Sequence, residues 1–315
     1  MMISQRAQIA TKIYNINSPE QKMGKNHTNH TMSNGISNGI SSGQEVDIPP
    51  KDQEKVEDLL LRLPFKPFAI VTVSLPLFSM LFCFVTAVIF QYDQVNLTVC
   101  KVQNFIPSIS AVTGVSPQRY VWRICIALHS TPRFAVGIMY YNMYKKDIHN
   151  IDPRHHKLYR FLLKLNFMLY MIENACLIGV TYISNTDNYP VHEMIFVVFM
   201  VSSLCYMLLT SIIYQWSKGP LEKWTHLEKF SCKCKWYLWI GIMSCTAALL
   251  FFFYKHRVLC EPGAFSWFSL SEYGIAITNM SYHMTGAIDF NGRHFINAFF
   301  SPRPAASNGN LKKQN

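Results

Sequence analysis

The feature that most constrains this chain is a series of separate apolar segments, each about 20 residues long. A helix rises about 1.5 Å per residue, so about 20 apolar residues cross a hydrocarbon core roughly 30 Å thick. Backbone amides in lipid need partners within their own segment, so each segment is predicted to be a helix. The expected fold class is therefore all-α, a polytopic membrane protein built as a bundle of six transmembrane helices. The six segments cover about residues 67–90, 120–144, 159–184, 193–216, 236–254 and 265–289.

The chain outside these segments is polar and is expected to form two tails. Residues 1–58 include an Asn-, Ser- and Gly-rich stretch over residues 29–43 and show no hydrophobic periodicity, which predicts a disordered tail. The membrane domain is expected over residues 59–295, followed by a second tail over residues 296–315. No cationic start followed by an apolar core is present, so no cleavable signal peptide is expected.

The distribution of basic residues among the loops predicts the orientation of the bundle. The loops at residues 145–160 and 217–235 together hold ten Lys and Arg residues, whereas those at residues 91–119, 185–192 and 255–264 hold four. Loops richer in Lys and Arg face the cytosol, so both termini are predicted to be cytosolic. Basic residues between spans also contact anionic lipid headgroups, so the net charge of +11 does not indicate a nucleic-acid partner.

Two cysteines and one glycosylation sequon lie in the loops that are predicted to face the lumen. Cys100 and Cys260 are the two cysteines on that side, where disulfides persist, and we predict a bond between them. Asn96, in the sequence Asn-Leu-Thr, is a candidate glycosylation site. The other cysteines form no metal-ligand pattern of recognisable spacing, so we expect no metal site.

Three of the predicted spans contain charged, histidine or asparagine side chains. Such residues are costly in lipid and are expected to face the bundle interior or a wet cavity. Glu272, Asn279 and His283 are spaced by seven and four residues, which places them on one face of a helix. The other members are Arg123, His129 and Arg133 in the second span and Asn166, Glu173 and Asn174 in the third.

Depth below the lumenal surface predicts which of these residues meet. At about 1.5 Å per residue, Arg123 and Glu272 both lie roughly 6–10 Å below that surface. By the same count, His129 and Glu173 both lie at roughly 15–16 Å. We therefore predict two pairs, Arg123 with Glu272 and His129 with Glu173. Two interpretations of the cluster stay open: the pairs only tie helices together, or they line a path or a lipid headgroup pocket.

Four strings of residues in the membrane body are long enough to be specific. They are residues 104–109 (NFIPSI), 117–134 (PQRYVWRICIALHSTPRF), 165–184 (LNFMLYMIENACLIGVTYIS) and 278–290 (TNMSYHMTGAIDF). On these strings, and over about residues 58–295, the chain resembles the six-span family that contains the post-GPI attachment factors and the DRAM autophagy modulators.

The resemblance implies a protein of Golgi and endoplasmic-reticulum membranes that acts in GPI-anchor lipid remodelling. It implies a requirement in the reacylation of lyso-GPI at sn-2 with a saturated fatty acid, which retains GPI-anchored proteins at the cell surface. The implied partners are GPI lipid or GPI-anchored proteins, the membrane and, if the chain does not catalyse the transfer itself, an acyltransferase. Both versions stay open, because the His-x4-Asp pattern of many glycerolipid acyltransferases is absent: Asp289 follows His283 by six residues. No cofactor is recognisable, and the sequence does not identify the acyl donor.

Candidate site residues follow from this interpretation. A histidine helped by a carboxylate can act as a general base toward a lipid hydroxyl, and an arginine fork binds two phosphate oxygens at once. The candidates for catalysis are His129, Glu173 and His283. The candidates for headgroup binding are Arg123, Arg133, Glu272, Asn279 and His192. Two other function classes stay open, a non-enzymatic adaptor or chaperone for GPI-anchored cargo and a transporter of ions or small solutes.

Overall fold

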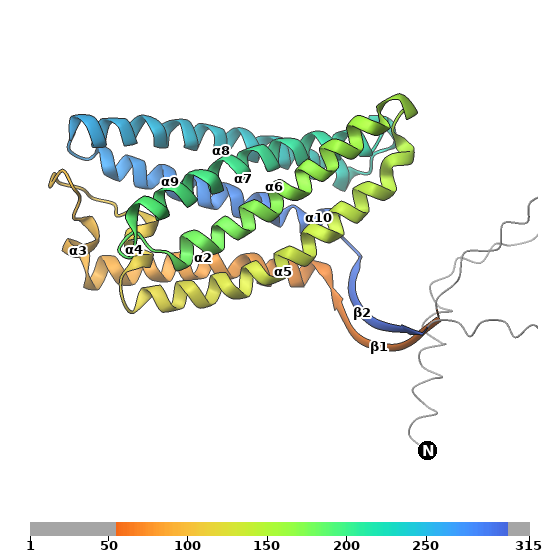
Figure 1. The fold of residues 1–315 in the computed structure, drawn as a ribbon, viewed down its shortest axis with the longest axis horizontal. Helices are drawn as coiled ribbons and strands as arrows, with labels where there is room; N and C mark the ends of the chain where they lie inside the picture. The colour runs from red at the N-terminus through yellow and green to blue at the C-terminus, as the bar shows by residue number, and fades with distance from the viewer. Residues whose placement is uncertain (1–54, 302–315) are drawn as a thin grey trace, which may run out of the picture. The chain divides into compact units, whose positions relative to one another are not determined.

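Six long helices packed side by side make up most of the computed structural model, which describes residues 55–301 (Figure 1). Successive helices run in opposite directions, with connecting segments at the two ends of the bundle. The predicted all-α class is confirmed for this part of the chain, apart from one pair of strands. The helices are α2 (Phe65–Phe90), α5 (Gln118–Lys146), α6 (His156–Tyr182), α7 (Tyr189–Ser217), α8 (His226–Leu259) and α9 (Ala264–Met284).

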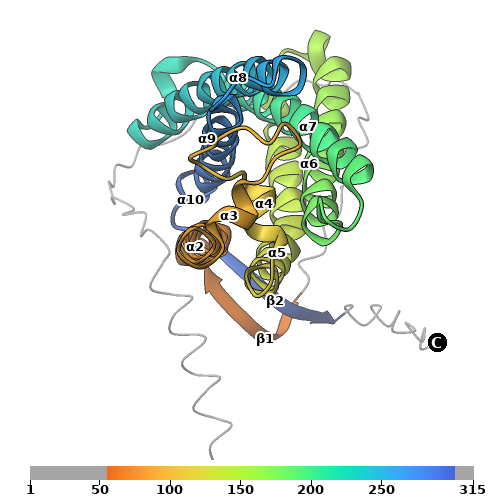
Figure 2. The ribbon, with the colours of Figure 1, turned by 90° about the vertical axis from the view of Figure 1, so that its left-hand side faces the viewer.

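One end of the bundle carries a disulfide bond, and we call it the disulfide end. It holds the segment between α2 and α5, which includes the short helices α3 (Tyr92–Asn96) and α4 (Ile109–Gly114). Cys100 of this segment is bonded to Cys260, which follows α8, and these are the two cysteines that the sequence analysis paired. Figure 2 looks onto this end and shows α4 lying between the long helices.

The opposite end carries the two strands, and we call it the strand end. β1 (Lys55–Pro64) runs antiparallel to β2 (His294–Ser301), which follows the short helix α10 (Gly286–Asp289). The sequence analysis did not predict this pairing. Residues 1–54 and 302–315, which contain most of the two predicted tails, lie outside the described residues. The described residues also include three short 3-10 helices: η1 (Asp147–Asn150), η2 (Pro153–His155) and η3 (Leu221–Lys223).

Four of the six long helices, α2, α6, α7 and α8, are long and apolar enough to cross a membrane. Their outer faces expose large apolar side chains, and Phe78, Ile89 and Leu250 are each more than half exposed. Because such surfaces are not stable in water, the chain is a membrane protein. α5 and α9 do not qualify by composition. In α5 the cause is polar side chains such as Arg123 and Arg133.

A buried ion pair joins α8 to α10 at the strand end. Lys235 Nζ lies 2.7 Å from Asp289 Oδ2, and both side chains are 1% exposed. The ammonium also donates to Ser231 Oγ at 2.7 Å, and the Tyr140 hydroxyl of α5 donates to Asp289 Oδ2 at 2.7 Å. The carboxylate therefore connects three elements of the bundle.

The sequence analysis missed this pair because it began the fifth span at residue 236 and assigned Lys235 to a loop. α8 extends beyond that predicted span at both ends. Thr225 and Glu228 form a capping box, which satisfies backbone donors at the start of the helix and lets it begin at His226. Lys235 consequently lies inside a helix and points toward Asp289.

Removing the cation of the buried pair is expected to destabilise the protein strongly. Lys235→Met leaves Asp289 buried without a counter-charge, which typically lowers the free energy of unfolding by about 3–5 kcal/mol. The loss is measured by thermal unfolding of the purified protein in detergent. The double variant Lys235→Met with Asp289→Leu is expected to recover most of this loss. The control is Lys218→Ala, which removes a partly exposed pair with Glu228 and is expected to cost at most about 1 kcal/mol. Equal losses for the two single variants would contradict the role given to the buried pair.

Candidate functional site

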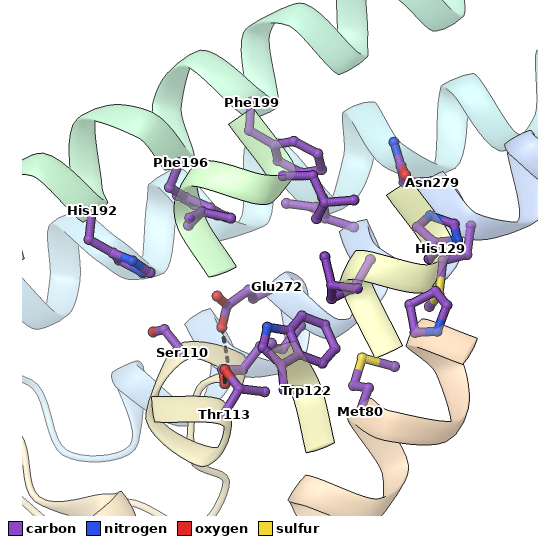
Figure 3. A pocket seen from close by; sticks show the side chains of 18 residues that line it. Met80, Ser110, Thr113, Trp122, His129, His192, Phe196, Phe199, Glu272 and Asn279 are labelled. Carbon is purple, nitrogen blue, oxygen red and sulfur yellow. Dashed lines mark hydrogen bonds between the residues drawn. The ribbon is translucent and has the colours of Figure 1, made fainter. Parts of the chain in front are cut away.

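A cavity of about 110 Å³ lies inside the bundle toward the disulfide end (Figure 3), and we call it the central cavity. α2, α4, α5, α6, α7 and α9 contribute to its wall, and most of the lining side chains are apolar. The polar ones are Ser110, Thr113, His129, His192, Glu272 and Asn279. Four of the eight residues predicted for catalysis or headgroup binding therefore line one space.

The segment between α2 and α5 closes the central cavity at the disulfide end. The amides of Phe105 and Ile106 donate to the Ser266 hydroxyl of α9 at 2.7 and 3.2 Å. The amide of Ile109, the first residue of α4, donates to Glu272 Oε2 at 2.8 Å. These bonds hold α4 against α9. The sequence analysis missed the contribution of α4, because six residues are too few to show a helical period.

Arg123 does not meet Glu272, so the predicted pair is wrong. Arg123 Nη2 lies 3.3 Å from Asp187 Oδ2 and donates to the Tyr182 carbonyl oxygen at 3.0 Å, outside the central cavity. Asp187 lies between α6 and α7, where hydrogen bonds from the Ser184 hydroxyl and amide, together with Arg123, hold its pKa below the usual value. The depth count failed because it gives the height along a helix but not the direction of a side chain.

Two histidines of the central cavity make the same hydrogen bond to a backbone carbonyl group. His129 Nδ1 lies 2.7 Å from the carbonyl oxygen of Thr72, and His192 Nδ1 lies 2.7 Å from the carbonyl oxygen of Ile183. A carbonyl oxygen only accepts, so in the neutral ring Nδ1 carries the hydrogen and Nε2 is left as an acceptor. The predicted pair of His129 with Glu173 is wrong, since Thr72 takes the place of the carboxylate. The cavity thus contains two ring nitrogens able to accept a hydrogen bond.

Glu173 is instead the centre of a polar network beside the central cavity. Arg133 Nη2 lies 3.1 Å from Glu173 Oε2, and these side chains are 4% and 0% exposed. Asn279 Nδ2 donates to Glu173 Oε1 at 2.7 Å and to Ser203 Oγ at 2.6 Å. His283 Nε2 lies 2.7 Å from Arg133 Nη2 and 3.1 Å from Glu173 Oε1. It therefore accepts from the guanidinium in one tautomer or donates to the carboxylate in the other.

This network changes the interpretation of three predicted residues. Arg133, predicted to bind a headgroup, lies 15 residues into α5 from the disulfide end, which at about 1.5 Å per residue is roughly 22 Å deep. A headgroup at the bilayer surface does not reach that depth. Glu173 and His283, predicted to be catalytic, do not line the central cavity. For these residues the structure favours the first interpretation of the cluster, ties between helices.

The predicted glycosylation of Asn96 is disfavoured by its surroundings. Asn96 is the last residue of α3, is 9% exposed, and its Nδ2 donates to the Tyr92 carbonyl oxygen at 3.0 Å. A glycan would be attached through this nitrogen. Glycosylation would therefore break the hydrogen bond and require room for a sugar at a buried position.

The fold and the central cavity define a helical membrane protein with a largely apolar internal site that contains two histidine rings. Residues 64–292 match the Frag1/DRAM/Sfk1/Cwh43P N-terminal domain, and the chain belongs to this family.

Three relatives extend the comparison. The chain is 47% identical over 259 residues to a Drosophila melanogaster protein named post-GPI attachment to proteins factor 2-like, covering 81% of this chain and 78% of the relative. It is 37% identical over 251 residues to a Xenopus tropicalis protein named acyltransferase PGAP2, covering 78% and 96%. It is 32% identical over 242 residues to a Caenorhabditis elegans protein named post-GPI attachment to proteins factor 2, covering 76% and 90%. No solved structure matches the chain.

Removing Arg133 from the network around Glu173 is expected to destabilise the bundle far more than removing Arg123, a partly exposed arginine that also lies in α5. Arg133→Met leaves the Glu173 carboxylate buried without a cation, at an expected cost of about 3–5 kcal/mol. The matched control Arg123→Met removes a partly exposed pair with Asp187 and is expected to cost at most about 1 kcal/mol. Both are read as midpoints of denaturant unfolding of the purified protein in detergent. A loss for Arg133→Met no larger than that for Arg123→Met would show that the network does not hold the helices together.

Proposed function

We propose that this protein remodels the lipid part of GPI anchors by adding a saturated acyl chain to lyso-GPI at sn-2. Its relatives carry the names post-GPI attachment to proteins factor 2 and acyltransferase PGAP2, and these names support the proposal. A single acyl chain gives only marginal membrane binding. The second chain therefore retains GPI-anchored proteins at the cell surface.

The proposed topology has six spans in Golgi and endoplasmic-reticulum membranes, with the tails at residues 1–58 and 296–315 in the cytosol. α2 ends at the disulfide end and α6 begins at the strand end, so α5 has to bring the chain back across the bilayer. α9 does the same after α8. Large apolar side chains exposed on both helices, Ile124 and Leu128 on α5 and Trp267 on α9, support this topology. Disulfides persist in the lumen, which supports a lumenal position for the disulfide end.

The observation that carries the proposal is the position of His192 in the central cavity. Acyl transfer to a hydroxyl needs a group that takes the proton of that hydroxyl. His192 lies three residues after the start of α7, about 5 Å from the disulfide end of the helix. His129 lies 11 residues after the start of α5, which is about 16 Å deep. The glycerol hydroxyl of lyso-GPI lies next to the headgroup, so His192 is the proposed base and the apolar wall contacts the acyl chain.

A non-enzymatic role differs from this proposal in one respect. A protein that presents lyso-GPI to a separate acyltransferase needs the cavity but needs no base within it. The Nε2 atom of His192 therefore distinguishes the two functions.

His192→Gln is expected to abolish most of the acyl transfer, because the amide cannot accept a proton as imidazole does. We expect conversion of lyso-GPI to two-chain GPI to fall by about 100-fold or more, within the range that general base catalysis contributes. The measurement is mass spectrometry of GPI lipids from cells in which the variant replaces the deleted protein at equal abundance. The matched control is His149→Gln, since His149 also bonds a carbonyl oxygen, that of Lys146 at 2.7 Å, but is exposed and far from the cavity. Normal conversion with His192→Gln would exclude His192 as the base and favour the adaptor role.

A further inference from the structure

A second cavity, of about 190 Å³, lies between α7, α8 and α9, and we call it the side cavity. It meets the central cavity, because the two share the lining residues Ser110, His192, Phe196 and Glu272. Two spaces that join at the proposed base are a suitable arrangement for two reactants. The proposed function uses only the central cavity and leaves the side cavity without a role.

The part of the side cavity away from His192 is apolar and reaches the outer surface of the bundle. Val197 of α7 and Leu250 of α8 both line it and are 47% and 55% exposed. Leu249 and Phe253 of α8 continue the apolar wall inward. α7 and α8 are both apolar enough to cross a membrane, so their exposed faces contact lipid chains. The side cavity is therefore an opening from the hydrocarbon region toward His192.

The end of the side cavity nearest the disulfide end has a negative charge in its wall and a positive charge beside it. Tyr189 and Glu193 line it. Arg257 does not line it, but its guanidinium carbon lies 5.9 Å from the centre of the Tyr189 ring. A guanidinium binds phosphate oxygens, and a carboxylate beside an aromatic ring attracts an ammonium group. An apolar cavity with Glu193 in the wall at one end and Arg257 beside that end matches the acyl chains and the headgroup of a zwitterionic phospholipid.

We propose that the side cavity binds a zwitterionic diacyl glycerophospholipid of the bilayer as the acyl donor. The inference rests on the proposed function and names its second substrate. The ester groups of such a lipid lie between its chains and its headgroup, so a lipid held with its headgroup at Glu193 and Arg257 presents an ester beside His192. A coenzyme A thioester from the cytosol would approach the strand end, which is the opposite end of the bundle.

The transfer then needs no further reactant. The hydroxyl oxygen of lyso-GPI, held in the central cavity, attacks the ester carbonyl carbon of the donor. A new C–O bond to the acceptor forms, and the C–O bond to the donor glycerol breaks. The hydroxyl proton passes to His192 Nε2 and from there to the leaving glycerol oxygen. The products are a two-chain GPI lipid and one lysophospholipid, and nothing is oxidised or reduced.

The donor is tested with the purified full-length protein in vesicles of phosphatidylcholine that carries ¹³C-labelled palmitoyl chains, with lyso-GPI as acceptor. We expect labelled two-chain GPI and an equal amount of lysophosphatidylcholine by mass spectrometry. A second arm uses vesicles of dialkyl ether phosphatidylcholine, which has no ester to transfer, and supplies labelled palmitoyl-coenzyme A. Transfer in the second arm at the rate of the first would overturn the phospholipid donor and leave the proposed function standing. No transfer in either arm would overturn both.

The location of the donor is tested with Leu250→Trp, which narrows the side cavity from its outer end without altering His192. Overfilling this space is expected to slow transfer by about tenfold or more. The matched control is Ile240→Trp, at a position of α8 that is 54% exposed and lines neither cavity. Equal rates for the two variants would overturn the side cavity as the donor site.

A photoreactive phosphatidylcholine with a diazirine in its acyl chain gives a readout that does not depend on transfer. Bilayer lipid also contacts the exposed faces of α7 and α8, so the readout is the crosslink to Leu249, which lines the side cavity and is 3% exposed. We expect this crosslink in the wild-type protein and in Ile240→Trp, and its loss in Leu250→Trp. A crosslink at Leu249 without any transfer would overturn the donor role while retaining a lipid site. A crosslink at Leu249 unchanged by Leu250→Trp would overturn the site itself.

Discussion

The carboxylate of Glu173 in α6 joins three helices at the middle of the bundle, and Asn279 extends the connection to a fourth; the shape of the central cavity depends on this network. The carboxylate accepts hydrogen bonds from Arg133 of α5 and Asn279 of α9, at 3.1 and 2.7 Å, and Asn279 also donates to Ser203 of α7. Lipid chains offer such groups no partners, so each of them depends on the others. Since α5, α7 and α9 also form walls of the central cavity, the network that holds the bundle together fixes the position of the site.

The connecting segments complete the site from the disulfide end. The bond between Cys100 and Cys260 fastens the segment between α2 and α5 to the end of α8, and the contact of Ile109 with Glu272 fastens it to α9. A carboxylate inside a long helix thereby satisfies the first backbone amide of the short helix α4, which is a structural use of a residue that the sequence marks as functional. The same contact keeps the Glu272 side chain at the junction of the two cavities. Access to His192 is left sideways between α7 and α8.

The sequence predicts the helices and the polar residues that gather inside the bundle, but not which of these residues meet. Apolar spacing is a property of one helix and can be read locally, so the long helices are found where the apolar segments lie. The rotation of each helix about its axis depends on packing, which is why Arg123 pairs with Asp187 of a connection and not with a residue at equal depth. Lys235 was misplaced because the helix begins ten residues before the predicted apolar span does, at His226 and not at residue 236. β1 and β2 are separated in the sequence by all six long helices, and no local pattern predicts a contact between segments so far apart in the chain.

The polar groups inside the bundle fall into two sets that differ in their partners. Arg133 with Glu173 and Lys235 with Asp289 are paired in charge and join helices. His192 has Nδ1 bonded to the backbone, whereas no hydrogen bond among the described residues engages its Nε2. His192 is half-buried and lines both cavities, so its Nε2 is accessible to a ligand. Under the proposed function, a lipid hydroxyl that donates to Nε2 gains a hydrogen bond and is at the same time placed for loss of its proton. One accessible acceptor would then serve both the binding of the acceptor lipid and its reaction.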